Sequence, residues 1–392
     1  MNRPKVSIVR AYNYDSPQIY SAIEESIDLI GGLETIIKPG NKVFVKINHL
    51  SPASEAERGI VTHPAFVEAV LELLKRTDAE ITVGDDIDSG DGDGFQISGF
   101  RQMCRRMGIN LINLREAGFV ETDCQGHFLR KVHLSSTVLG ADVIVNLPKL
   151  KTHSLTIFTG GVKNMFGIIP HGLRIRFHGE YIKVEDFSQV LTDVFSTMIP
   201  HLTIMDGVIA MEGDGPSSGK LRNLGVVLAS RDAVAVDAVA TKIIGREPFD
   251  IYTTRYSNER GLGVGNLDNI ELVGERLENV VVPDFKLPTN AIAIVMRRIP
   301  GFLSKFVQGQ LAIKIVVIEQ RCTLCLECQK ICPAAAITMG DGAVEVNHHV
   351  CIGCMCCHEV CRFNAITPKR RITVRIISFL SIILGKLRAL ST

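Results

Sequence analysis

Short apolar runs alternate with amphipathic stretches along residues 5–244 of this chain. The apolar runs predict strands at residues 5–9, 42–47, 80–83, 110–113, 143–147, 201–205 and 226–229. Apolar residues at helical spacing predict helices at residues 17–37, 64–76, 95–107, 184–198 and 232–244, with Thr62 as the N-cap of the second. Strands that alternate with helices indicate an α/β fold, in which a mostly parallel sheet has helices on both faces.

Most of the polar and glycine-rich segments follow directly after a predicted strand. Lys46 and Asn48 end the strand at 42–47, an aspartate-rich loop follows the strand at 80–83, and a basic segment begins with the strand at 143–147. In open α/β sheets, ligands bind at the carboxyl ends of the strands. The sequence therefore predicts a binding site at this edge of the sheet.

The segment 143–179 contains no carboxylate, although the whole chain has nearly equal numbers of basic and acidic residues, 43 and 42. Its density of cations predicts a pocket for a small molecule that carries a phosphate or a carboxylate. The alternative is a solvated basic loop that pairs with acids elsewhere. Glycines 160 and 161 would let backbone N–H groups approach a ligand closely. The expected ligand-binding residues are Lys46, Asn48, Lys149, Lys151, Asn164 and Arg174.

Four further residues are candidates for catalysis. The unperturbed pKa of histidine lies near physiological pH, so three histidines at the predicted site could supply protons to a bound substrate. Lys163 follows the glycine pair and would lie against the ligand. The predicted catalytic residues are His63, His153, His178 and Lys163.

Two acidic loops could complement the basic segment. The loop at 85–93 contains five aspartates, which could bind a divalent cation or a sugar hydroxyl, or only solvent. It lacks the closing Glu of an EF-hand. The second loop, at 206–219, matches neither a Walker loop nor a Rossmann fingerprint.

Nine of the eleven cysteines lie between residues 322 and 361. Two runs of the form Cys-x-x-Cys-x-x-Cys-x-x-x-Cys begin at Cys322 and at Cys351, so one repeats the other 29 residues later. This spacing is typical of proteins with two [4Fe–4S] clusters, in which the fourth Cys of each run ligates the other cluster. The predicted ligands are Cys322, Cys325, Cys328 and Cys361 for cluster 1, and Cys351, Cys354, Cys357 and Cys332 for cluster 2. Cys356 is left over.

The alternatives for these cysteines are weaker. Structural zinc uses two pairs of ligands, often with His, and a disulfide scaffold needs an oxidising compartment. The segment 318–367 resembles bacterial-type two-cluster ferredoxins, with the signature Cys332-Pro333-Ala334-Ala335-Ala336-Ile337. The second copy has Arg362 in place of the proline. A guanidinium beside Cys361 should raise the potential of its cluster.

Six motifs of the α/β part resemble the domain-of-unknown-function 362 family over residues 1–285. They occur in the order of the family and are Val45–Asn48, Thr62–Pro64, Leu147–His153, Gly161–Gly167, Met211–Pro216 and Asp232–Asp237. Members of this family often carry a ferredoxin-type module. The resemblance implies the fold and the place of the site, and it leaves the substrate open.

The expected organisation is an α/β domain at 1–287, an apolar basic connector at 288–317, a two-cluster ferredoxin domain at 318–368 and a basic amphipathic tail at 369–392. No secretory signal and no transmembrane run is found, which together with the clusters predicts the reducing cytosol. The tail could contact the inner face of a membrane, or dock on the chain itself or on a partner. The net charge of +1 and the absence of Trp argue against nucleic-acid binding.

The leading hypothesis is a cytosolic, anaerobic-type reductase, which receives electrons from a redox partner protein and passes them from the two clusters to an anionic small molecule in the α/β domain. One alternative is an electron-transfer adaptor that docks a partner oxidoreductase. Another is a scaffold that handles clusters or metals. Whether a further cofactor sits in the α/β domain stays open.

Overall fold

The computed structural model describes residues 3–50, 54–87, 93–289, 314–361 and 363–369. Its centre is a ten-stranded sheet with the strand order β12-β1-β11-β10-β7-β2-β3-β4, to which β8 and β9 are attached beside β10. The strands are β1 (Lys5–Arg10), β2 (Lys42–Ile47), β3 (Glu80–Asp85), β4 (Asn110–Asn113), β7 (Val143–Leu147), β8 (Lys149–His153), β9 (Ile157–Thr159), β10 (Leu202–Glu212), β11 (Lys220–Ser230) and β12 (Glu271–Gly274). Most of their pairings are parallel.

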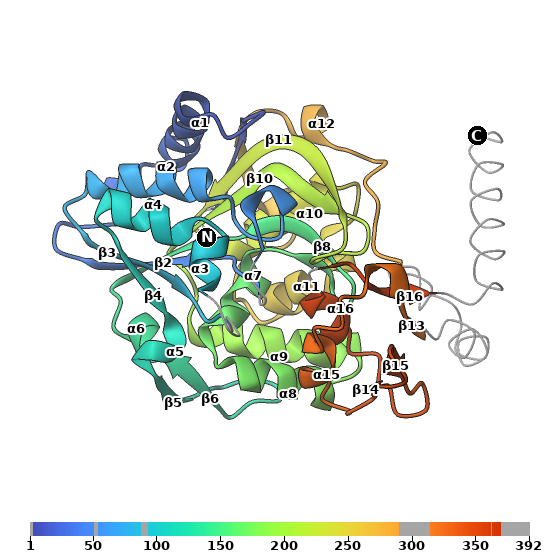
Figure 1. Cartoon of the computed structure of the whole chain (residues 1–392). Coiled ribbons are helices and arrows are strands. Elements are labelled where there is room, and N and C mark those ends of the chain that lie inside the picture. Colours follow the sequence, from blue (N-terminus) through green and yellow to red (C-terminus); the bar gives the residue numbers. More distant parts are fainter. Residues whose placement is uncertain (1–2, 51–53, 88–92, 290–313, 362, 370–392) are drawn as a thin grey trace, which may run out of the picture.

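Helices cover both faces of the sheet (Figure 1). On one face, α1 (Ser16–Asp28), α2 (Pro64–Lys75) and α4 (Phe100–Met107) bury their apolar sides against alternate residues of β2, such as Val43 and Val45. On the other face, α9 (Val184–Thr197) packs in the core that contains Phe44 of β2, and α10 (Ala233–Ile243) packs against β1. The predicted α/β class, with a mostly parallel sheet, is confirmed.

The smaller elements lie around this sheet. They are α3 (Gly94–Ile97), α5 (Leu114–Ala117), the hairpin β5 (Phe119–Asp123) and β6 (Lys131–Ser135), α6 (Ser136–Leu139), α7 (Gly161–Asn164), α8 (His171–Glu180), α11 (Tyr252–Glu259) and α12 (Leu277–Val280). Among the described residues, no helix is both long enough and apolar enough to cross a membrane.

Several predicted boundaries differ from the structure. The helix expected at 17–37 ends at Asp28, because Gly31 and Gly32 have positive φ angles of 109° and 79°. The helix expected at 95–107 is divided into α3 and α4 by Gly99, whose φ is 86°. Thr62 is not the N-cap of α2; His63 takes that place and accepts a hydrogen bond from the N–H of Ala65 at 3.2 Å.

The predicted acidic loop at 206–219 is largely strand. β10 and β11 each have eleven residues and form a long antiparallel hairpin, with a register shift between Gly207 and Ile209. Only the turn between Glu212 and Lys220 projects as a loop. This turn lies against the C-terminal module.

The C-terminal module is small and contains short helices and strands. It comprises β13 (Lys314–Val317), α15 (Glu327–Lys330), β14 (Ile337–Met339), β15 (Val344–Val346), α16 (Cys356–Val360) and β16 (Ile366–Lys369). β13 pairs with β16 and β14 pairs with β15, both antiparallel. β13 lies in the segment expected as connector; residues 290–313 of that connector and 370–392 of the tail are outside the described residues.

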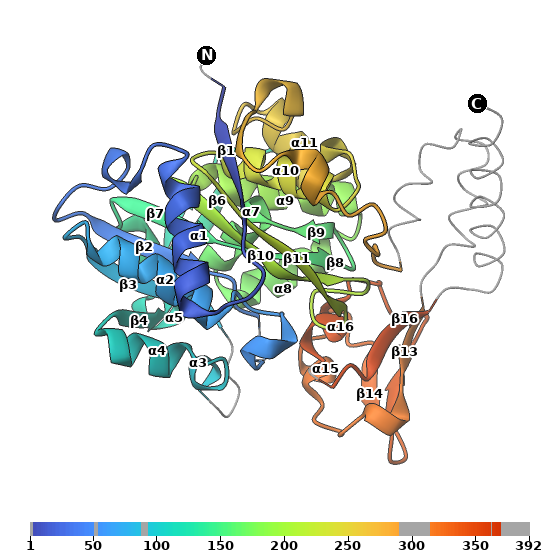
Figure 2. The ribbon, with the colours of Figure 1, turned by 90° about the horizontal axis from the view of Figure 1, so that it is seen from above.

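The module docks on the α/β domain at the end of the β10–β11 hairpin (Figure 2). The buried ring of His358 has its Nε2 3.0 Å from the carbonyl oxygen of Asp214 and its Nδ1 2.9 Å from that of Ile366. The hydroxyl of Ser217 donates to the carbonyl of His358 at 3.2 Å. Gly179 of α8 is so close to Pro333 that an added Cβ would lie 3.0 Å from the proline ring.

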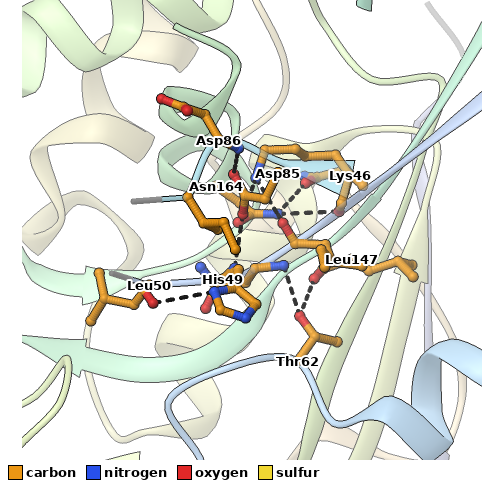
Figure 3. A network of polar contacts seen from close by, with 12 residues as sticks. Lys46, His49, Leu50, Thr62, Asp85, Asp86, Leu147 and Asn164 are labelled. Atoms are coloured by element: carbon orange, nitrogen blue, oxygen red, sulfur yellow. Dashed lines mark hydrogen bonds and ion pairs between the residues drawn. The ribbon is translucent and has the colours of Figure 1, made fainter. Parts of the chain in front are cut away.

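One threonine joins the ends of two central strands. The hydroxyl of Thr62 accepts from the N–H of Asn48 at 2.9 Å and donates to the carbonyl of Leu147 at 2.6 Å, and both strand ends carry site residues (Figure 3). Thr62 is fully buried. Its hydroxyl therefore fixes the distance between the end of β2 and the end of β7.

We expect Thr62→Val to lower the free energy of unfolding by about 1–3 kcal/mol, because the buried N–H of Asn48 and the carbonyl of Leu147 would lose their partner. Thr62→Ser keeps the hydroxyl and should lower the free energy of unfolding clearly less. Urea denaturation followed by circular dichroism measures both. Thr62→Val keeps a methyl group and removes only the hydroxyl, so a loss in Thr62→Val no larger than that in Thr62→Ser would contradict this role of the hydroxyl.

Candidate functional site

A cavity of about 60 Å³ lies at the carboxyl ends of the central strands and is lined mostly by polar side chains. Lys46 and Asn48 come from the end of β2, three residues come from β8, two from α7 and one from α8. The structure thus brings together eight of the predicted residues, which are Lys46, Asn48, Lys149, Lys151, His153, Lys163, Asn164 and Arg174. β8 supplies Lys149, Lys151 and His153 from one face, because alternate residues of a strand point the same way.

Two of the lysines are held in buried ion pairs. The amine of Lys46 lies 2.7 Å from a carboxylate oxygen of Asp85, and that of Lys149 lies 2.8 Å from Asp206. Lys149 also donates to the hydroxyl of Tyr14 at 2.6 Å, and Tyr14 donates to Asp206 at 2.8 Å. Burial and the charge of Asp206 raise the pKa of Tyr14 well above its usual value, so it stays protonated.

Arg174 is paired with the aspartate-rich loop. Its Nη2 lies 2.9 Å from Asp86, which also accepts from Arg115 at 2.9 Å. Asp93 caps α3 and pairs with Arg101 at 2.7 Å. Among its described residues, this loop forms no group of three side chains that could hold a metal ion; Asp88 and Asp91 lie outside the described residues. The aspartates that are described neutralise cations of the site.

Among the described residues of the α/β domain, Lys151 and Lys163 have no acidic partner of this kind. The amine of Lys151 donates to the carbonyl of Ile60, and burial, together with the charge of Lys163, lowers its pKa to about 7. No hydrogen bond or ion pair joins Lys163 to another described residue. Burial lowers its pKa, and Glu359 opposes that shift.

Glu359 of the C-terminal module lies in the wall of this cavity. It sits on α16, between the predicted ligands Cys357 and Cys361, and its carboxylate is 3.0 Å from Nε2 of His153. Nδ1 of His153 accepts from the N–H groups of Leu155 and Thr156, so the proton of the neutral ring is on Nε2. Nε2 and Oε1 of Glu359 are 3.0 Å apart but do not have the geometry of a hydrogen bond. Burial alone would raise the pKa of Glu359, but the histidines and Lys163 hold it well below its usual value.

The three predicted catalytic histidines occupy different places. His153 lines the cavity, and His178 lines an adjoining cavity of about 90 Å³ together with Lys163, Arg174, Cys356 and Glu359. His63 is not among the lining residues; it stacks on Tyr14 with a centroid distance of 3.7 Å. Burial lowers the pKa of His153 and of His178 to about 4 and also lowers that of His63, so all three depart from the unperturbed value of histidine.

Sequence reasoning missed two residues of the site. His49 is buried beside Asp85, donates its backbone N–H to that carboxylate at 2.8 Å, and has its pKa lowered to about 4 by burial (Figure 3). Its place directly after Asn48 could have identified it. Glu359 could not be found from spacing, because it reaches the cavity only through the docking of the two domains.

The eight predicted cluster ligands all lie in the C-terminal module, and four of them line one cavity. Cys322, Cys325, Cys328 and Cys361 line one cavity of the module, although Cys361 comes from the second run. Burial raises the pKa of Cys357 most, and the charges of Cys354, Cys351, Cys332 and Cys328 raise it further. Cys332 of the first run also raises the pKa of Cys351, together with burial and Cys354, so it lies near cysteines of the second run. This arrangement of thiols fits the crossed ligation of two [4Fe–4S] clusters.

The backbone repeats the cysteine pattern. Leu326 and Ala335 have positive φ angles of 59° and 46°, and Met355 and Asn364, each 29 positions later, have 67° and 51°. The N–H of Ala336 donates to the sulfur of Cys332 at 3.2 Å, and that of Ala365 donates to the sulfur of Cys361 at the same distance. Hydrogen bonds to ligand sulfurs stabilise the negative charge of a cluster and tune its potential. Arg362 itself lies outside the described residues.

Comparison with known families gives a match for each part of the chain. A family described as domain of unknown function (DUF362) matches residues 43–242, which is 200 of the 392 residues. A 4Fe-4S dicluster domain matches residues 314–362. The second match supports [4Fe–4S] clusters as cofactors, and a dicluster domain fits a count of two.

Similar proteins were found for most of the chain and for shorter stretches of it. A thylakoid-associated protein from Synechocystis is 30% identical over 285 residues, which cover 72% of this chain and 87% of that protein. An indolepyruvate oxidoreductase subunit from Methanothermobacter marburgensis is 36% identical over 84 residues, which cover 21% of this chain and 13% of that one. The lactate racemase apoprotein from Thermoanaerobacterium thermosaccharolyticum shares 12% identity with a TM-score of 0.40, over 59% of this chain and 55% of that one.

The pKa of Lys151 predicts a dependence of stability on pH. In the unfolded chain this lysine has a pKa of 10.5 and in the folded chain about 7, so between these values the unfolded state binds more protons. The destabilisation caused by Lys151 should therefore shrink as the pH rises from 7 to 10, by at most about 1.4 kcal/mol per pH unit. Denaturation of the wild type and of Lys151→Met across this range measures it, with the exposed Lys183→Met as control. Parallel curves for wild type and Lys151→Met would contradict the assignment.

Cys356 is expected to be dispensable for the clusters, because its side chain lines the cavity with Lys163 and His178 and belongs to neither quartet. Cys356→Ser should keep about eight iron atoms per chain, the number in two [4Fe–4S] clusters. Cys354→Ser, the matched change two residues earlier, should lose about half of them. Iron and sulfide analysis of anaerobically reconstituted protein measures both contents. Full iron content in Cys354→Ser would remove Cys354 from the ligand set, and loss of half of the iron in Cys356→Ser would show that Cys356 is needed for a cluster.

Proposed function

This chain belongs to the domain of unknown function (DUF362) family, and from that premise we propose that it is an iron–sulfur oxidoreductase, which passes electrons from its clusters to a small anion bound in the basic cavity. One observation carries the proposal. Glu359, which lies two residues from Cys357 and two from Cys361, forms part of the cavity wall beside His153. The cluster module and the anion site therefore share one helix, α16.

The two predicted quartets differ in the exposure of some of their cysteines. Cys354 and Cys357 are buried, and α16, which begins at Cys356, carries the residues that contact the basic cavities. Cys325 of the other quartet is exposed, and Leu324 and Phe363 beside it are 40% and 38% exposed. This difference supports an order in which electrons enter from a redox partner protein at cluster 1 and leave through cluster 2.

The proposal gives a role to the lysines and to one histidine of the cavity. A [4Fe–4S] cluster transfers one electron at a time, so the two together can supply the two electrons of a reduction. Lys151 and Lys163 attract the anion and stabilise negative charge that develops on it. His153 holds its proton on Nε2 beside the bound molecule, and the neutral ring can donate a hydrogen bond there. The ion pairs of Lys46 and Lys149 keep the cavity wall in place.

A second candidate function is an electron-transfer adaptor that docks a partner oxidoreductase. The exposed apolar side chains beside Cys325 favour it, because they offer a contact surface next to a cluster. The likeness of the module to a subunit of an oxidoreductase supports it as well. In this case the basic cavity would bind no substrate that accepts electrons.

Peripheral contact with a membrane is a further part of the proposal. The name of the Synechocystis relative places that protein at the thylakoid. The basic tail at 369–392, of which only Lys369 is described, has the composition of a segment that binds anionic lipid.

The reaction of the reduced protein with small molecules separates the two candidates. Anaerobically reduced protein is mixed with the small-molecule fraction of a cell extract, and reoxidation of the clusters is followed by visible absorbance. An enzyme should be reoxidised, and Lys163→Met should slow the reaction at least tenfold, because the unpaired cation that holds the anion is gone. The exposed Lys183→Met serves as the matched control.

Reoxidation by the protein fraction alone would favour the adaptor. An unchanged rate in Lys163→Met, with its cluster content intact, would show that electrons leave the protein somewhere other than the basic cavity.

A further inference from the structure

The charges around the basic cavity do not balance. Among the described lining residues, Lys46 is paired with Asp85, and Lys149 and Arg174 are paired with Asp206 and Asp86. Lys151 and Lys163 remain, and Glu359 is the one acid left to offset them. With both lysines protonated, the cavity has a surplus of one positive charge. A buried surplus charge is unfavourable unless a ligand of opposite charge enters.

The cavity also has buried hydrogen-bonding atoms of both kinds without a partner among the described residues. Nε–H of Arg174 is an unused donor, and Oδ1 of Asn48 and Oδ1 of Asn164 are unused acceptors. Since an unsatisfied buried polar atom is costly, a ligand that fits this cavity supplies a partner to each kind. An anion with acceptor oxygens alone would serve the cations and leave the two amide oxygens unpaired.

The orientation of Asn164 is fixed by its neighbours. Nδ2 of Asn146 donates to the carbonyl of Gly161 at 3.0 Å, so the other amide atom of Asn146, Oδ1, must act as an acceptor. It accepts from Nδ2 of Asn164 at 2.7 Å. The remaining atom of Asn164 is therefore its oxygen, and this side chain is 94% buried (6% exposed) in the cavity wall (Figure 3). The need for a donor on the ligand follows from this chain of hydrogen bonds.

The volume limits the size of the ligand. A site for one water-sized group needs about 10–15 Å³ of this kind of volume, so about 60 Å³ accommodates roughly four to six non-hydrogen atoms. Nucleotides, sugar phosphates and peptides are too large for the cavity as it stands. A dianion would exceed the single surplus charge and would lie against Glu359.

From these four observations we infer that the cavity binds a small monoanion of about four to six non-hydrogen atoms, which carries a planar oxyanion head and, next to it, a hydrogen-bond donor. The head lies between Lys151 and Lys163, and the donor reaches the oxygens of Asn48 and Asn164. This inference names the ligand class of the proposed function and rests on the same cavity. A 2-hydroxy carboxylate and bicarbonate share this chemistry.

Glu359 fits this assignment as a neighbour of the ligand. Its carboxylate lies in the wall of the cavity, 3.0 Å from Nε2 of His153. Because Glu359 belongs to the cluster module, the ligand would lie against α16 and would sense the charge of the adjacent cluster.

Calorimetric titration of the oxidised, cluster-loaded protein tests the ligand class without any electron donor, so its outcome does not depend on turnover. The probes form two matched pairs. Glycolate carries a hydroxyl that acetate lacks, and bicarbonate carries an O–H group that nitrate lacks. Malonate serves as the dianion. At pH 6.5, glycolate should bind at least fivefold more tightly than acetate, or bicarbonate at least fivefold more tightly than nitrate, and malonate should bind more weakly than the better donor-bearing probe.

Two variants separate charge from donor recognition. Lys163→Met should weaken the binding of every probe at least tenfold. Asn164→Leu should abolish the preference for the probe with a donor while it keeps the affinity for acetate or nitrate, and Asn48→Leu provides the same test if Asn164→Leu does not fold. Lys183→Met should change nothing.

The two pairs also show whether the ligand is an organic hydroxy acid or the inorganic bicarbonate ion. Preference for glycolate over bicarbonate assigns an organic hydroxy acid, and the reverse assigns the inorganic ion. Equal binding of the members of both pairs, tighter binding of malonate, or binding weaker than roughly 10 mM by every probe would overturn the inference.

Discussion

Cations buried at the ends of the central strands need anionic partners, and this requirement accounts for much of the structure. Lys46 and Lys149 find Asp85 and Asp206 within the sheet, at 2.7 and 2.8 Å. Lys151 and Lys163 find none there, and the carboxylate that offsets them comes from Glu359 of the C-terminal module. The docking of the module is therefore tied electrostatically to the site, because removing it would expose an unbalanced basic cavity.

The same contact links two kinds of chemistry. α16 carries Cys357 at one end of its sequence, contacts the basic cavity through Glu359, and is held to the β10–β11 turn by His358. This short helix carries a predicted cluster ligand and also lines the basic cavity, so it keeps the separation between the two constant. The repeat of left-handed residues and of N–H to sulfur bonds, 29 positions apart, keeps the cysteines of both quartets in comparable loops.

Much of the cavity was predictable from the sequence, because one acid-free segment supplies β8, α7 and α8. Alternation along β8 places Lys149, Lys151 and His153 on one side, and the glycine pair before Lys163 allows α7 to begin close to the strand ends. The pKa values of the histidines were not predictable, since they depend on burial. Glu359 was not predictable either, because nearly two hundred residues separate it from Lys163 and only tertiary docking joins them.

The fold shows the same division between local pattern and tertiary context. Apolar runs located the central parallel strands correctly, while glycines with positive φ ended or divided two helices earlier than periodicity suggested. The long hairpin of β10 and β11 was underestimated, because Gly207 and the acidic residues of β10 look like a loop and are paired only by the facing strand. Patterns of single segments do not contain that pairing.

The central claim is that the clusters and the basic cavity form one functional unit. Electron paramagnetic resonance of the reduced protein, recorded with and without a saturating small anion such as glycolate, tests it most directly. The account predicts that the anion changes the spectrum of one of the two clusters in the wild type and leaves it unchanged in Lys163→Met. Calorimetrically verified binding in the wild type with identical spectra of both clusters would contradict the claim.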